Sequence, residues 1–153
     1  MAKLRAGVIG CGGRGRGHGR GYAAADGITL VACADPFEES RAAYVGEFDV
    51  ARSYEDYPEM LEKEDLDVVS VCTWTGMHRE MIEAVVASGV KAIHSEKPMA
   101  TSWGDAKAIV KACDDNGVTI TFCHQRRFGA QFVKAKEIAK SGAIGEVYRF
   151  EAS

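Results

Sequence analysis

Short runs of apolar residues, rich in valine and isoleucine, alternate along the chain with amphipathic stretches at helical spacing. The runs are nearly continuous in apolar residues, which is typical of strands buried on both faces of a parallel sheet. A repeated succession of strand and helix predicts an α/β fold with a doubly wound parallel sheet and right-handed crossovers. The predicted strands lie around Val8 and begin at Ile28, Val68, Val90 and Val118.

Helices are predicted between these strands where good helix formers carry an apolar stripe. One of them begins with Ser102, a suitable N-cap, and stops at Asn116-Gly117, a C-terminal signal. A shorter unit, with a strand at 50–52 and a helix near 58–63, is also predicted. The remaining predicted helices span residues 38–48, 79–87 and 130–140.

The strand around Val8 runs into an unusual stretch, GCGGRGRGHGRG at residues 10–21. The dinucleotide fingerprint GxGxxG fits it in one register, with Gly10, Gly12 and Gly15. Gly10 permits a tight turn, Gly12 lets the backbone approach a pyrophosphate, and Gly15 allows close contact between helix and strand. We therefore expect a pyrophosphate at the start of the following helix, where free N–H groups meet it. Gly13 and Arg14 are expected to contact it as well.

An acidic residue, Asp35, ends the ITLVACAD strand about twenty residues after Gly15, where the fingerprint requires an acceptor for the ribose hydroxyls. A carboxylate there repels a 2′-phosphate, so we expect NAD in preference to NADP. Two alternatives remain: Asp35 only caps the turn with Pro36, or the glycine stretch is an arginine-glycine arm for nucleic acid. The second conflicts with the absence of aromatic residues from the stretch and with the net charge of −3.

Composition excludes several other classes of site. The five cysteines form no CxxC pair and the four histidines no HxxxH pair, so we expect no metal site and no disulfide framework. Reduced thiols fit a cytoplasmic protein. The longest run without Asp, Glu, Lys or Arg, residues 68–78, is shorter than the roughly 18 residues of a membrane span. No nucleic acid and no membrane are therefore expected as partners.

Four ordered motifs carry a family resemblance. The glycine fingerprint is followed by CTWTGMHREMIEAVVASGV from Cys72, SEKP at 95–98 and CHQRRF at 123–128. This arrangement resembles the Gfo/Idh/MocA family of nicotinamide-dependent oxidoreductases, whose N-terminal domain has a Rossmann fold. Trp74 stands where that family usually has proline, and Gln125 where it usually has asparagine.

The resemblance implies roles for individual residues. Thr73, Trp74 and His78 would lie along the cofactor, although His78 could equally cap the helix that it begins. Glu96 and Lys97 would sit beside the nicotinamide ribose and ring, with Lys97 as the catalytic residue that reaches the substrate oxygen. An ammonium there stabilises a developing alkoxide. Gln125 completes the predicted cofactor-binding residues.

The resemblance also implies the domain organisation and the activity. Residues 1–145 would form the dinucleotide-binding domain, and 146–153, whose 147–150 segment alternates apolar and polar residues, the first strand of a second, substrate-binding domain. The parent protein would be a homo-oligomeric, NAD-dependent oxidoreductase acting on a sugar, polyol or related small hydroxy compound. An NAD-dependent glycosidase of the same family and a non-catalytic NAD-sensing module remain as alternatives. The residues leave open which substrate is used and whether this chain alone is active.

Overall fold

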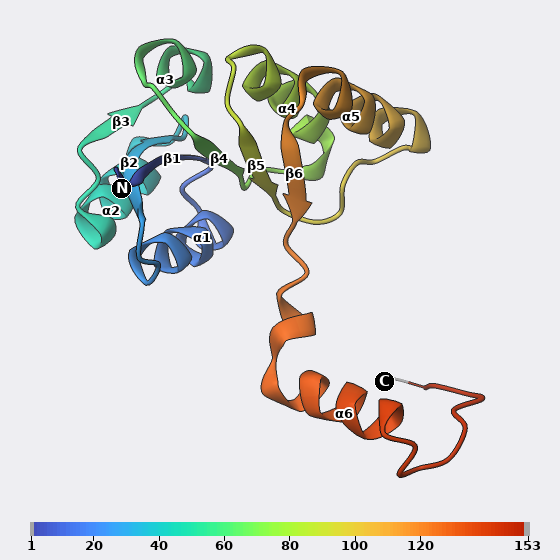
Figure 1. Cartoon of the computed structure of the whole chain (residues 1–153). Coiled ribbons are helices and arrows are strands. Elements are labelled where there is room, and N and C mark those ends of the chain that lie inside the picture. Colours follow the sequence, from blue (N-terminus) through green and yellow to red (C-terminus); the bar gives the residue numbers. More distant parts are fainter. Residues whose placement is uncertain (1, 152–153) are drawn as a thin grey trace. The chain divides into compact units, whose positions relative to one another are not determined.

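The computed structural model describes residues 2–151, and this part of the chain contains a parallel sheet of six strands (Figure 1). The strand order is β3-β2-β1-β4-β5-β6, with every neighbouring pair parallel. This is the predicted doubly wound arrangement. The strands are β1 (Leu4–Ile9), β2 (Ile28–Ala34), β3 (Arg52–Tyr54), β4 (Val68–Val71), β5 (Ala92–Ser95) and β6 (Thr119–Phe122).

Helices cover both faces of this sheet (Figure 1). One face carries α1 (Gly13–Ala23) and α2 (Glu38–Phe48). The other carries α3 (Tyr57–Lys63), α4 (His78–Ala87) and α5 (Trp103–Asn116), with the 3₁₀ turn η1 (Thr75–Met77) before α4. No helix within residues 2–151 is both long enough and apolar enough to cross a membrane.

The helix α5 begins and ends at the residues that the sequence predicted, and its two caps show why. The Ser102 hydroxyl accepts a hydrogen bond of 3.1 Å from the backbone N–H of Asp105, as an N-cap does. Gly117 ends the helix in the left-handed conformation with φ 65°, which costs glycine little. Both signals were predicted from the sequence, and both are confirmed.

Two apolar clusters form the core, one on each face of the sheet. Consecutive residues of β1 face opposite sides, so Val8 belongs to the cluster that contains Tyr44 of α2, and Ile9 to the cluster that contains Ile82 of α4. Because helices cover both faces, apolar residues are favoured on both sides of the central strands. This explains their continuous apolar runs.

Backbone hydrogen bonds continue past the carboxyl ends of four neighbouring strands. The N–H of Gly10 donates to Ala34 O at 2.8 Å, that of Cys72 to Ile9 O at 2.8 Å, and that of Glu96 to Val71 O at 2.9 Å. The residues that follow β2, β1, β4 and β5 are thereby lined up along one edge of the sheet. This edge is where parallel α/β proteins bind ligands.

A second compact unit begins at His124 and contains η2 (Gln125–Phe128) and α6 (Ala130–Lys140). Neither element buries a side chain. Residues 145–151 form no strand in the described part of the chain, and the prediction that 146–153 is the first strand of a second domain stays a prediction. An alternating pattern makes a strand only where another strand pairs with it, and no strand of the described residues does so. The predicted domain boundary after residue 145 stays a prediction.

Candidate functional site

The glycine loop between β1 and α1 has the tight geometry that its sequence predicts. Gly10 has φ 95°, and a Cβ placed on it would lie 2.6 Å from the carbonyl oxygen of Cys72. A Cβ on Gly15 would lie 1.9 Å from the carbonyl oxygen of Gly10. Any side chain at either position would therefore push the loop or the helix out of place.

The other two glycines of the loop face open space. A Cβ on Gly12 or Gly13 would meet no atom within 4 Å. Gly12 is the N-cap of α1, and no side chain caps the N–H groups that follow it. The start of α1 also has no acidic residue. An uncapped helix start beside open space is suited to a phosphate, because the free N–H groups and the helix dipole both favour an anion.

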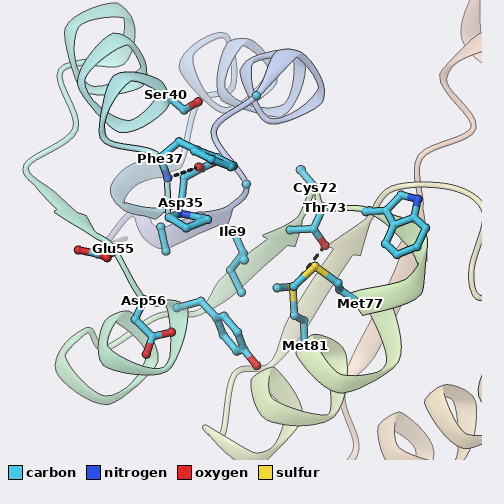
Figure 2. A pocket seen from close by; sticks show the side chains of 16 residues that line it. Ile9, Asp35, Phe37, Ser40, Glu55, Asp56, Cys72, Thr73, Met77 and Met81 are labelled. Carbon is cyan, nitrogen blue, oxygen red and sulfur yellow. Dashed lines mark hydrogen bonds between the residues drawn. The ribbon is translucent and has the colours of Figure 1, made fainter.

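Asp35 lies directly after β2, and its carboxylate binds backbone N–H groups at the carboxyl end of the sheet. One carboxylate oxygen accepts a hydrogen bond of 2.8 Å from the backbone N–H of Cys11. The other accepts a hydrogen bond of 2.9 Å from the backbone N–H of Phe37 (Figure 2). The turn-forming role that the sequence left as an alternative is therefore real. It is compatible with a ligand, because an ionised carboxylate can accept about four hydrogen bonds.

A cavity of about 540 Å³ opens between the glycine loop and the ends of β2 and β4 (Figure 2). The walls combine apolar side chains with three carboxylates, Asp35, Glu55 and Asp56. The lining residues are Ile9, Gly10, Gly12, Ala34, Asp35, Pro36, Phe37, Ser40, Glu55, Asp56, Tyr57, Cys72, Thr73, Trp74, Met77 and Met81. This volume and this mixed lining are typical of a site for a small organic ligand.

Sequence reasoning missed the acidic wall of the cavity. Glu55 and Asp56 follow the short strand β3, whose position was predicted two residues too early. No motif marks them. The only available signal was topological, because a residue just after a parallel strand reaches the same edge of the sheet as Asp35.

Two predicted residues, Thr73 and Trp74, line the cavity on the β4 side. The Thr73 hydroxyl donates a hydrogen bond of 3.3 Å to the Met81 sulfur, which fixes its orientation (Figure 2). The Trp74 side chain is 76% exposed. A large apolar ring so exposed beside a cavity is a surface on which a flat ligand can pack.

His78 is fully buried and does not line the cavity among the described residues. It is not the N-cap of α4, because Met77 takes that position and no side chain caps the helix start. Its Nδ1 lies 3.0 Å from Pro98 O and its Nε2 lies 3.2 Å from Thr73 O. The imidazole therefore connects the turn after β4 with the SEKP segment. A direct contact with a cofactor stays a prediction.

Glu96 is the centre of a buried polar cluster at the end of β5. Its side chain accepts hydrogen bonds from Arg14 Nε at 2.9 Å and lies 3.2 Å from His18 Nε2. Burial raises the pKa of the Glu96 carboxyl, but the hydrogen bonds from Arg14 and His18 outweigh it, and the pKa lies below its ordinary value. Arg14, predicted to contact a pyrophosphate, thus places its guanidinium on Glu96. The Glu96 carboxylate in turn holds the pKa of Arg14 above its ordinary value.

His18 extends this cluster into the sheet. Its Nδ1 lies 2.9 Å from the Ser70 hydroxyl, which in turn lies 2.7 Å from the Tyr22 hydroxyl. Burial lowers the pKa of His18 despite the neighbouring Glu96. Sequence reasoning assigned no role to His18, although it lies one helical turn after Arg14 and so shares its face of α1.

The remaining predicted residues lie outside the cavity. Lys97 is exposed directly after Glu96, and its backbone N–H lies 3.3 Å from Glu96 Oε2. Gln125 lies in η2 of the second unit, so its role stays a prediction. The structure thus brings Gly10, Gly12, Asp35, Thr73 and Trp74 together around one cavity, and Arg14 together with Glu96 beside it.

The chain matches one family model and is similar in sequence to several known dehydrogenases. The family model GFO_IDH_MocA, described as an oxidoreductase family with an NAD-binding Rossmann fold, matches residues 4–124. The chain is 33% identical over 145 residues to the D-apiose dehydrogenase of Paraburkholderia graminis, covering 95% of this chain and 38% of that protein. It is 30% identical over 143 residues to the myo-inositol 2-dehydrogenase of Thermotoga maritima, covering 94% and 42%.

Solved structures show the same likeness. The WlbA dehydrogenase of Bordetella pertussis, crystallised with NADH and UDP-GlcNAcA, matches with a TM-score of 0.86 and 32% identity. The match covers 95% of this chain and 44% of that one. The chain therefore spans about two fifths of the length of the relatives that it matches.

Proposed function

Because the chain belongs to the Gfo/Idh/MocA oxidoreductase family and carries its NAD-binding Rossmann fold, we propose that it is the cofactor-binding part of a sugar or polyol dehydrogenase. The D-apiose and myo-inositol dehydrogenases that it resembles are named for a sugar and a polyol. The likeness covers less than half of each relative, so the substrate class is part of the proposal.

The observation that carries this proposal is the pairing of an open helix start with a carboxylate at the next strand end. The space beside Gly12 accommodates a pyrophosphate at the start of α1, and Asp35 lies across the cavity with acceptor positions for ribose hydroxyls. The acidic wall with Glu55 and Asp56 adds repulsion against a 2′-phosphate. These features support NAD over NADP.

The proposed catalytic group is Lys97, at the end of β5. When bound, NAD supplies an acceptor for the hydride from the carbon that bears the substrate hydroxyl. Lys97 holds a positive charge for the oxygen of that hydroxyl and stabilises the alkoxide that develops as its proton leaves. The exposed Lys97 side chain is free of the buried cluster around Glu96, so it can reach a substrate.

Replacement of Lys97 in the full-length parent tests this proposal. Lys97→Met should lower kcat/KM on a sugar or polyol by about 10²-fold or more while leaving the Kd for NAD unchanged. Lys91→Met is the matched control, because Lys91 is also exposed but precedes β5 and lies at the opposite end of that strand. Unchanged turnover by Lys97→Met would contradict the assignment.

The alternative function, a non-catalytic NAD-sensing module, is distinguished from an enzyme by the turnover of the wild-type parent. A sensor binds NAD but shows no turnover across a panel of sugars and polyols in the wild-type parent. The enzyme proposed here shows NADH formation with at least one member of that panel, measured by absorbance. Turnover without NAD would contradict both functions.

A further inference from the structure

Three side chains with nitrogen or sulfur donors meet on one face of the sheet, beside the Glu96 cluster. They are His18 of α1, His94 of β5 and Cys123, which directly follows β6. One ligand atom from each lies within 4.8 Å of the others. The two imidazole rings lie with their centroids 4.6 Å apart and their planes tilted by 34°. Segments distant in the sequence thus bring three metal-binding groups to one point.

Each histidine is held by a hydroxyl group on one of its ring nitrogens. His18 Nδ1 lies 2.9 Å from Ser70 Oγ, and His94 Nδ1 lies 2.8 Å from Thr121 Oγ1. Metal-binding histidines typically make such a second contact, which fixes the ring orientation and leaves the other nitrogen for the metal. In His94 the nitrogen that remains is Nε2. In His18 the Nε2 lies 3.2 Å from a Glu96 carboxylate oxygen, so binding requires the cation to replace that contact and the ring proton to move to Nδ1, where it faces Ser70 Oγ.

The electrostatic surroundings favour a cation. The Glu96 carboxylate lies 3.2 Å from His18 Nε2 and also takes part in a hydrogen bond with the Cys123 thiol. Arg14 balances part of this negative charge through its ion pair of 2.7 Å with Glu96.

From this geometry we propose that His18, His94 and Cys123 bind a divalent cation of the zinc class. Two imidazole nitrogens and a thiolate suit Zn²⁺ or Co²⁺, whereas Mg²⁺ and Ca²⁺ prefer oxygen donors. His94 and Cys123 are partly exposed and give the ion access, while the buried His18 closes the inner side. Donor atoms around zinc lie about 3.3–3.8 Å apart. Side-chain rotations that move the donor atoms by about 1 Å would therefore complete the site.

Binding requires one proton to leave. The Cys123 thiol releases its proton to the solvent, and the thiolate sulfur donates an electron pair to the cation; no electron is transferred. The sequence spacing gave no sign of this site, because residues 18, 94 and 123 form no ligand motif. The site is also separate from the proposed cofactor cavity, whose lining includes none of the three.

Titration of the 153-residue chain with Co²⁺ tests the proposal. We expect one Co²⁺ per chain, a sulfur-to-cobalt charge-transfer absorption in the near ultraviolet, and displacement by Zn²⁺. Cys123→Ser should abolish that absorption, and His94→Gln should weaken Co²⁺ binding by at least about tenfold. The matched controls are Cys113→Ser, a buried thiol of α5, and His124→Gln, an exposed imidazole; both should leave the titration unchanged.

Two results would overturn the proposal: no charge-transfer absorption in the wild-type chain, or an absorption that survives Cys123→Ser. Circular dichroism of each variant shows whether it is folded. Should Cys123→Ser fail to fold, His94→Gln decides alone, since unchanged Co²⁺ affinity in that variant contradicts the site. Gly12→Val, which alters the proposed cofactor cavity, should bind Co²⁺ like wild type, so failure of the cofactor proposal is distinguishable from failure of this one.

Discussion

The backbone N–H of Cys11 donates a hydrogen bond of 2.8 Å to the carboxylate of Asp35, and this bond joins the glycine loop to the end of β2. Both residues are buried. The other Asp35 oxygen accepts from the N–H of Phe37 at 2.9 Å. The residue proposed to recognise the ribose therefore also holds the loop proposed to receive the pyrophosphate.

Asp35→Asn should destabilise the chain even without a ligand. The amide can offer an oxygen to only one of the two backbone N–H groups and turns its NH₂ toward the other. We expect a loss of about 1–2 kcal/mol in the free energy of unfolding, measured by urea denaturation. Asp56→Asn is the control, because Asp56 lines the same cavity but makes no side-chain cap to α3. An equal loss in both variants would contradict the structural role of Asp35.

Gly12→Val should remove NAD binding while the fold remains. A Cβ on Gly12 meets no protein atom within 4 Å, so the valine occupies only the space proposed for the pyrophosphate. Calorimetry should show at least about a hundredfold weaker NAD binding, with an unchanged circular dichroism spectrum. Gly17→Val, equally uncrowded but outside the cavity, controls for the effect of valine on α1. Similar NAD binding by both variants would mean that the fingerprint register is wrong.

Mild acid should destabilise the chain through the buried His18 and the partly buried His94. Burial lowers the pKa of His18 and His94 below the ordinary 6.5, and the neighbouring imidazole lowers that of His94 further. Unfolding lets both take up protons more readily, so their contribution to stability is complete above about pH 6.5 and is lost as the pH falls through the lowered values. Thermal melts between about pH 7.5 and 5 should show a falling Tm.

The variant His18→Gln isolates this effect, since it should flatten the dependence of Tm on pH. His124→Gln, at an exposed position, should leave the slope as in wild type. The window stays above the range in which Glu96 acts: its pKa is lowered, so its contribution is present above the ordinary value of 4.5 and is lost as the pH falls from there through the lowered pKa. A Tm that is constant down to pH 5 in the wild type would contradict the lowered pKa values of these two rings.

Truncation after Gly129 should leave the first unit intact. The deleted part contains α6, which buries no side chain, and the irregular segment with the exposed Tyr148 and Phe150. We expect the Tm to change by less than about 3 °C and NAD to bind as before. A chain that unfolds after this truncation would show that α6 contributes to the core.

The periodicity of the sequence was sufficient for most of the fold, because buried parallel strands and amphipathic helices differ in their spacing of apolar residues. The helices at 38–48 and 130–140 were predicted with the bounds that they have. Whether 146–153 forms a strand depends on pairing with another strand and not on the pattern alone, so that part stays a prediction. The fingerprint likewise located Gly12 and Asp35 at one cavity.

The periodicity of the sequence could not predict which side chains contact one another. Glu96 lies 78 positions from His18 and 82 from Arg14, and no local pattern reveals which side chains the sheet brings together. The same holds for His94 and Cys123. The acidic wall of the cavity was missed because the short strand before Glu55 carries little apolar signal.

Calorimetric titration of the wild-type chain with NAD⁺ and NADP⁺ tests the central claim most directly. The glycine loop and Asp35 predict one NAD⁺ per chain, with NADP⁺ bound at least about tenfold more weakly because its 2′-phosphate meets the carboxylates of the cavity. Absence of NAD⁺ binding, or NADP⁺ binding that is equal or tighter, would contradict the account.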